Sequence, residues 1–99
     1  MGCYRDDSTI RAVPDLERTD PVLDGYYRVR QNAVEKCAIV ARKRGFRMFA
    51  IQHHGQCLSS ATAGETFEKY GKSDKCSDDG KGGPWANNVY AFRGGENFF

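Results

Sequence analysis

The 99-residue chain lacks the patterns that most often reveal a function directly. It has no C-x-x-C pair, which disfavours a zinc knuckle or a thioredoxin-type redox centre. Its longest apolar run, residues 37–41, is far shorter than the roughly 20 residues of a membrane-spanning helix. Its net charge at pH 7 is only +2. We therefore expect neither a membrane span nor a nucleic-acid partner.

The sequence also lacks a catalytic or metal-binding pattern. His53 and His54 are neighbours, which point to opposite sides of an extended chain, and no third ligand follows at a useful spacing. We expect them to be exposed at a hairpin tip. Asp74, Asp78 and Asp79 lie in a glycine-rich loop, but not in the order of a calcium-binding loop. We predict a protein that is not an enzyme and has no metal or cofactor.

The composition is that of one globular domain. Hydrophobic residues make up 39% of the chain, which is enough for a core and argues against a disordered protein. We place the domain at residues 2–93 and a tail at residues 94–99. Met1-Gly2-Cys3 leads directly into Tyr4-Arg5-Asp6-Asp7, without an apolar signal segment. Because the cysteines predict disulfides, as argued next, we expect that Met1 stands where a signal sequence has been removed.

Four cysteines, Cys3, Cys37, Cys57 and Cys76, are spread over most of the chain. Widely separated single cysteines in a short chain are typical of disulfides, and disulfides persist in secreted proteins. We therefore predict a secreted, extracellular protein with two disulfides. A cytosolic protein with four free thiols is the alternative.

The clearest element is a helix over residues 32–44. Asn32 suits the N-cap, Glu35 stands where a capping box requires it, and Gly45 can supply a left-handed end. Apolar residues at helical spacing predict its buried face, comprising Val34, Cys37, Ala38 and Ala41.

Shorter elements surround this helix. We predict strands at residues 2–5, 46–52, 57–59 and 88–92, with a turn at Gly55-Gln56 and a brief strand or extended segment at 26–29. A second helical turn or two is expected at 65–70, and a loop at 71–84. The fold class is α+β: a small antiparallel sheet of four to five strands packed on one main helix.

The helix also suggests how the cysteines pair. Cys37 lies on its buried face and Cys57 lies in the returning hairpin strand, so a bridge between them would link helix to sheet. Cys3 with Cys76 would then link the first strand to the late loop. Four cysteines allow three connectivities, so only geometry can decide.

Several segments resemble WSC domains and PAN/apple domains. Residues 2–6, the helix bearing Cys37, and residues 49–52 with 55–57 look like the opening two-thirds of a WSC domain. The helix-to-strand cysteine link is similar to the core bridge of apple domains. Residues 83–90 resemble the end of a cysteine-poor extracellular variant. The chain departs from both families in having fewer cysteines, with none near its C-terminus. The resemblance implies a carbohydrate-binding or protein-binding module, and no ligand residue can be transferred.

Aromatic and amide side chains supply the candidate binding residues. Aromatic rings stack on the apolar faces of sugars, and polar side chains hold the hydroxyl groups. The predicted ligand-binding residues are Trp85, Asn87, Asn88, Gln52, His53, Tyr26 and Tyr27. For Trp85, a place in the core is an equal alternative.

The expected function is that of a secreted, non-catalytic, lectin-like module that binds a glycan. The alternative is a protein-binding or extracellular-matrix module of the apple type. A basic segment offers a further site, for an anionic polysaccharide, although a solvated helix face explains the same residues: Arg42, Lys43, Arg44 and Arg47.

Overall fold

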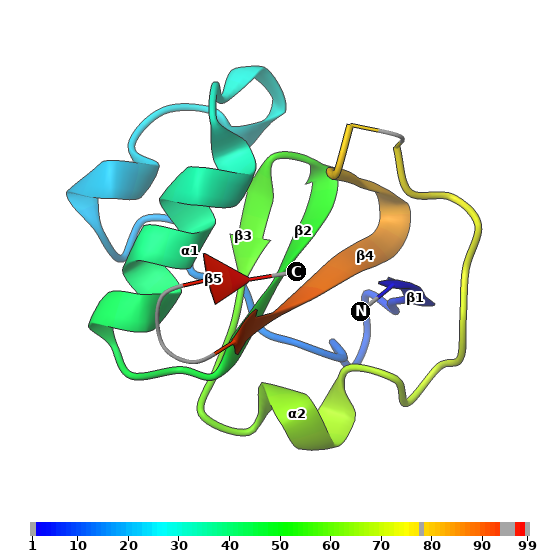
Figure 1. The fold of residues 1–99 in the computed structure, drawn as a ribbon. Helices are drawn as coiled ribbons and strands as arrows, with labels where there is room; N and C mark the ends of the chain where they lie inside the picture. Colours follow the sequence, from blue (N-terminus) through cyan, green and yellow to red (C-terminus); the bar gives the residue numbers. More distant parts are fainter. Residues whose placement is uncertain (1, 78, 94–96, 99) are drawn as a thin grey trace.

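A computed structural model describes residues 2–77, 79–93 and 97–98 (Figure 1). The strands are β1 (Gly2–Arg5), β2 (Met48–His54), β3 (Gln56–Leu58), β4 (Gly82–Arg93) and β5 (Asn97–Phe98). The helices are α1 (Ala33–Lys43), α2 (Ala63–Thr66) and the 3-10 turns η1 (Pro21–Leu23) and η2 (Tyr27–Val29). The main sheet is antiparallel with the order β1-β4-β2-β3, and β5 pairs with the end of β4. The predicted α+β fold, with a small antiparallel sheet on one main helix, is confirmed.

Helix α1 matches its prediction in extent but not in the detail of its first turn. Asn32 occupies the N-cap, with a left-handed φ of 53° and no hydrogen bond from its side chain to the helix. The expected side-chain capping by Asn32 therefore does not form, although its backbone carbonyl accepts the first bond of the helix, from the Lys36 N–H at 2.9 Å. Gly45 has the predicted positive φ, 76°, just past the last turn.

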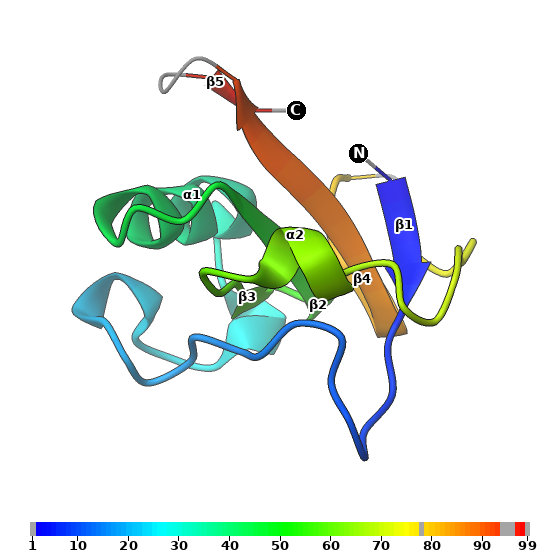
Figure 2. The ribbon, with the colours of Figure 1, turned by 90° about the horizontal axis from the view of Figure 1, so that it is seen from below.

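The sheet is covered on both faces, which explains why residues 48–51 form an unbroken apolar run instead of alternating with polar residues. Figures 1 and 2 show α1 beside β2 and β3, and α2 at another side of the sheet. The core on the α2 side comprises Tyr4, Ala12, Val13, Met48, Ala50, Leu58, Ala63, Phe67 and Val89. The core on the α1 side comprises Leu16, Leu23, Cys37, Ala38, Val40, Ala41, Phe49, Ile51 and Cys57.

Two disulfides link elements that are distant in the sequence. Cys37 of α1 is bonded to Cys57 of β3, and Cys3 of β1 is bonded to Cys76 in the loop before β4. The predicted pairing is confirmed. With sequence separations of 20 and 73 residues, closure of these loops contributes about 3 and about 4–5 kcal/mol by chain entropy. The bridges indicate an oxidising environment. None of the helices in the described part of the chain has the length and apolar character to cross a membrane.

Three predicted elements differ from the structure. Residues 27–29 form a 3-10 turn instead of a brief strand or extended segment. Helix α2 covers Ala63–Thr66 instead of residues 65–70. Strand β4 begins at Gly82 instead of residue 88. Its early start needs glycine, because a Cβ on Gly82 would lie 2.0 Å from the Ile51 carbonyl oxygen, and one on Gly83 would lie 1.9 Å from that of Lys75.

The expected tail lies partly outside the described residues, which omit 94–96 and 99. Within it, Phe98 pairs with Phe92 and Asn97 pairs with Arg93, so β5 folds back on the end of β4.

Candidate functional site

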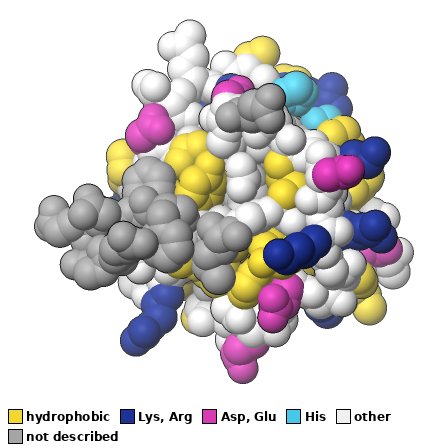
Figure 3. Space-filling model, turned by 45° about the vertical axis from the view of Figure 1, so that its right-hand side comes forward, with side chains coloured by type: hydrophobic (Ala, Val, Ile, Leu, Met, Phe, Trp, Pro, Cys, Tyr) yellow, Lys and Arg dark blue, Asp and Glu magenta, His cyan; other side chains and the backbone are white. Residues whose placement is uncertain are grey.

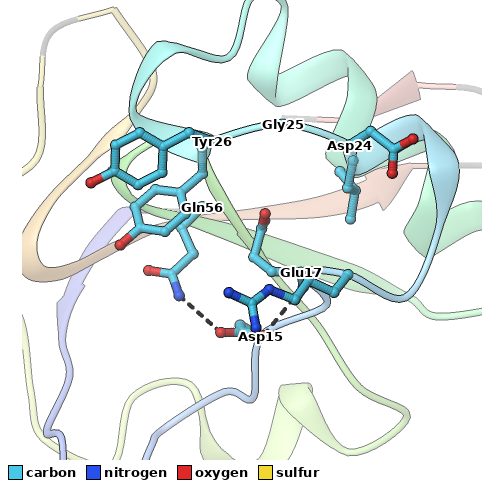
Figure 4. A pocket seen from close by; sticks show the side chains of 9 residues that line it. Asp15, Glu17, Asp24, Gly25, Tyr26 and Gln56 are labelled. Atoms are coloured by element: carbon cyan, nitrogen blue, oxygen red, sulfur yellow. Dashed lines mark hydrogen bonds between the residues drawn. The ribbon is translucent and has the colours of Figure 1, made fainter.

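The structure separates the predicted ligand-binding residues instead of gathering them into one site. Tyr26 and Tyr27 line one hollow, which we call the tyrosine cleft, and Trp85 lines a second, which we call the tryptophan hollow. The tyrosine cleft has a volume of about 790 Å³ and is lined by Asp15, Glu17, Arg18, Leu23, Asp24, Gly25, Tyr26, Tyr27 and Gln56 (Figure 4). The tryptophan hollow has a volume of about 610 Å³ and is lined by Arg5, Asp6, Lys72, Ser73, Asp74, Lys75 and Trp85.

A buried arginine holds the tyrosine cleft together. The Arg30 side chain is 1% exposed and forms a two-pronged ion pair with Glu17, with N–O distances of 2.6 and 2.8 Å. It also donates to the backbone carbonyls of Leu23, at 2.6 Å, and Gly55, at 2.9 Å. Glu17 in turn accepts from the Cys57 N–H at 2.9 Å. The irregular segment 15–30 is thereby fixed against β3, and the cleft lies between them.

The two tyrosines form the aromatic wall of the cleft. Their ring centroids are 5.1 Å apart, with an angle of 56° between the rings. Tyr26 is 58% exposed, whereas Tyr27 is half-buried. The exposed ring of Tyr26 can therefore take a ligand without any change in the core.

The opposite wall of the cleft is polar. Figure 4 shows Tyr26 and Asp24 on either side of Gly25, with Gln56 and Asp15 below them. Gln56 donates to Asp15 at 2.9 Å, which orients both side chains. Because Arg30 neutralises Glu17, the remaining charged groups are the exposed carboxylates of Asp15 and Asp24 and the guanidinium of Arg18. The rim is thus rich in hydrogen-bond acceptors.

His53 lies at the edge of the aromatic wall, with its ring centroid 6.1 Å from that of Tyr27. Arg28 Nη2 lies 2.5 Å from His53 Nε2, and since a guanidinium only donates, this nitrogen must be unprotonated. Burial lowers the pKa of His53, and the charge of Arg28 and the neighbouring His54 lower it further. Figure 3 shows histidine side chains (cyan) beside basic ones (dark blue) at the upper edge of the molecule.

The two histidines do not point to opposite sides of the strand, which corrects the sequence-based expectation. Their ring centroids are 5.6 Å apart. The cause is the backbone, because His53 and His54 have φ of 47° and 75° instead of extended values. Across the described residues, no three His, Cys, Asp or Glu side chains come together as a metal-binding group.

Gln52 and Asn87 lie beneath the surface, so we assign them a supporting role instead of ligand contact. They are 3% and 0% exposed. The Gln52 amide donates to Asp6 and to Asn87, each at 2.7 Å. Asn88 is half-buried and stands opposite Ile51 and Cys3 in the sheet.

Asp6 is the centre of this buried network. Burial raises its pKa, but hydrogen bonds from the Ala12 N–H, the Arg11 side chain and the Asp7 N–H outweigh that effect. The net result is a pKa below the ordinary value of an aspartate. The ionised carboxylate therefore stabilises residues 7–12, which follow β1.

The basic end of α1 is largely occupied by contacts within the molecule. Lys43 pairs with Asp20 at 2.7 Å, and this hydrogen bond is the main reason that the pKa of Asp20 is lowered. Arg44 donates to the backbone and side-chain oxygens of Thr19 at 2.8 Å. The Arg42 guanidinium lies 5.0 Å from the ring centre of Phe92. Lys43 and Arg44 thereby hold residues 19–20 against the end of the helix, and Arg42 contacts the end of β4.

Comparison with protein-family models, curated proteins and solved structures gives no match. The resemblance to WSC and apple domains stays a prediction from the sequence motifs.

Sequence reasoning missed the polar half of the tyrosine cleft, namely Asp15, Arg18, Asp24 and Gln56. One signal was available. Acidic residues are concentrated in the first part of the chain, and the turn dipeptide Asp24-Gly25 directly precedes the tyrosines. The acidic residues and the tyrosines lie beside Gln56 because of the Arg30–Glu17 pair, and no local sequence pattern indicates that pair.

Proposed function

We propose that this chain is a secreted, non-catalytic recognition module whose tyrosine cleft binds a carbohydrate. One observation carries the proposal: an exposed aromatic wall faces a polar wall across a cleft of about 790 Å³. Sugars need this pairing, because a pyranose ring presents an apolar face for stacking and hydroxyl groups at its edge for carboxylates and amides.

The charges of the cleft support a neutral sugar over an acidic one. Asp15 and Asp24 accept hydrogen bonds from hydroxyl groups, whereas they would repel a carboxylate or sulfate. Gln56 supplies an amide beside Asp15. The Arg30–Glu17 pair keeps the cleft in shape without a ligand, so little ordering accompanies binding.

A glycan array probed with the oxidised protein tests this function. We expect saturable binding to one class of neutral glycan. Tyr26→Ala should weaken that binding by about tenfold, since stacking on a tyrosine contributes roughly 1–1.5 kcal/mol. Tyr26→Phe should bind as the parent does, because it keeps the ring.

Ile39→Ala is the matched control, since Ile39 is also exposed, at 53%, and does not line the cleft. Binding that is unchanged in Tyr26→Ala, or absent for every neutral glycan, would contradict the proposal.

A protein-binding or extracellular-matrix module of the apple type is the second candidate. It is favoured by Val29, which is 75% exposed and lies close in sequence to the exposed Tyr26. Capture of one partner protein that is lost in both Tyr26→Ala and Val29→Ser, with no glycan bound, would favour this candidate.

A further inference from the structure

The tryptophan hollow shares no lining residue with the tyrosine cleft and has the opposite charge. We propose that it is a second binding site, which takes a sugar unit carrying a carboxylate or a sulfate group. This inference does not rest on the function proposed for the tyrosine cleft. It assigns acidic glycans to the hollow instead of to the basic end of α1.

The first observation is the backbone of Trp85. Its φ is 50°, in the left-handed region that a bulky residue rarely adopts. The conformation is fixed by the Asp6 N–H, which donates to the Trp85 carbonyl at 2.9 Å. Asp6 is itself anchored by the buried network with Arg11 and Gln52. The fold thus maintains a strained backbone that leaves the Trp85 side chain 50% exposed.

The second observation is that the walls of the hollow are built before any ligand arrives. The loop after α2 runs beside β1, where the Arg5 N–H donates to Gly71 at 2.9 Å and the Ser73 N–H donates to Cys3 at 3.0 Å. The Cys3–Cys76 disulfide closes the same loop. On the other side, Gly83 packs directly against the Lys75 backbone. The indole and the loop therefore keep a fixed spacing.

The third observation is the charge. Arg5, Lys72 and Lys75 line the hollow, and the exposed carboxylate there is Asp74, because Asp6 is buried and paired with Arg11 at 2.7 Å. Within the described part of the chain, Lys72 and Lys75 form no salt bridge. Two exposed ammonium groups beside an indole are therefore available for an anion.

Together these features select an acidic sugar. The Arg11 guanidinium lies 5.6 Å from the centre of the Trp85 ring, and the indole still stays 50% exposed, so its exposed apolar surface can take the sugar ring. Lys72 and Lys75 offer the positive charge for the acidic group of the sugar. A small inorganic anion would leave the indole unused. The volume, about 610 Å³, lies within the usual range of small-molecule sites.

Binding should be measured by calorimetry on the oxidised protein with three probes: heparin oligosaccharides, hyaluronan oligosaccharides and neutral cello-oligosaccharides. Heparin carries sulfate and carboxylate groups and hyaluronan carries carboxylates alone, so the pair separates the two acidic groups. We expect at least one acidic probe to bind. Trp85→Asn should weaken its binding by about tenfold or more. Asparagine tolerates the left-handed backbone, so this variant should still fold.

Lys72→Gln combined with Lys75→Gln should give a similar loss of affinity at low salt. The difference between this variant and the parent should disappear at about 0.5 M salt, because the Debye length is then only a few Å and the lysine charges are screened. The matched control, Arg42→Gln with Arg47→Gln, removes the same charge at the end of α1 and should change affinity less than about twofold.

Each of four results would overturn the inference. They are parental affinity in Trp85→Asn, parental affinity in the lysine variant, loss of binding in the α1 control, and failure of both acidic probes to bind. Tyr26→Ala should leave acidic-probe binding unchanged, so failure at one hollow is distinguishable from failure at the other.

Discussion

The buried Arg30 side chain offers the sharpest test of how the tyrosine cleft is held. Replacing it with alanine removes five hydrogen bonds, two to Glu17 and one each to the Leu23, Gly55 and Gly25 carbonyls, the last a long one at 3.5 Å. Glu17, 13% exposed, would lose its ion partner. Breaking a buried ion pair by removing one member costs about 3–5 kcal/mol. Because the Arg30 side chain is only 1% exposed, solvent screening reduces this figure little.

Urea unfolding of the oxidised protein measures this cost. Arg30→Ala should lower the free energy of unfolding by about 3–5 kcal/mol, a large part of the 5–15 kcal/mol typical of a small domain. Thermal unfolding should show a fall in Tm of about 12 °C or more. Arg30→Lys should recover only part of the loss, since an ammonium cannot form the two-pronged contact.

Arg28→Ala is the control, because Arg28 is an exposed arginine of the same segment and should change stability by less than about 0.5 kcal/mol. An Arg30→Ala variant within 1 kcal/mol or so of the parent would refute the reasoning. It would mean that the Arg30–Glu17 pair does not hold the segment in solution.

Three further results are expected. Gly45→Val should cost about 1 kcal/mol or more in urea unfolding, because its φ is 76°; equal unfolding midpoints would place the helix end elsewhere. The folded state lowers the pKa of Asp6, so its contribution should be complete above about pH 4 and lost as the pH falls through the folded pKa; an Asp6→Asn variant with the parent's acid-unfolding curve would contradict this. The fold also lowers the pKa of His53 below 6.5, so the stability of the protein should decline as the pH falls through 6.5. An NMR titration of His53 should show a higher pKa in Arg28→Ala than in the parent, and an unchanged pKa would exclude the arginine as a cause.

The main elements follow from local patterns. Residues 33–43 form a helix because apolar side chains recur at helical spacing and Gly45 can end it with a positive φ. Strands β1 and β2, with the hairpin to β3, follow from short segments that are rich in aromatic and apolar residues and have the length of strands. The disulfide pairing was suggested by the place of Cys37 on the buried face of the helix. These patterns involve residues that are close together in the sequence, so they can be recognised without the structure.

The sites could not be read in the same way. Gln52 and Asn87 look like ligand-binding amides in the sequence, but Asp6, which is far from both along the chain, draws them into a buried network. The sequence allows Trp85 to lie either in the core or at the surface. In the structure its backbone is left-handed and its side chain is half-exposed.

The tyrosine cleft likewise cannot be recognised from the sequence, because its walls come from segments that are far apart along the chain. Asp15, Tyr26 and Gln56 come together because Arg30 joins Glu17 to the backbone of the hairpin. The sequence by itself therefore determined the helix, most strands and the oxidising environment, since these depend on local periodicity and on cysteine content. Only the tertiary structure decided which polar side chains are buried and which line a cleft, because burial depends on contacts between segments tens of residues apart.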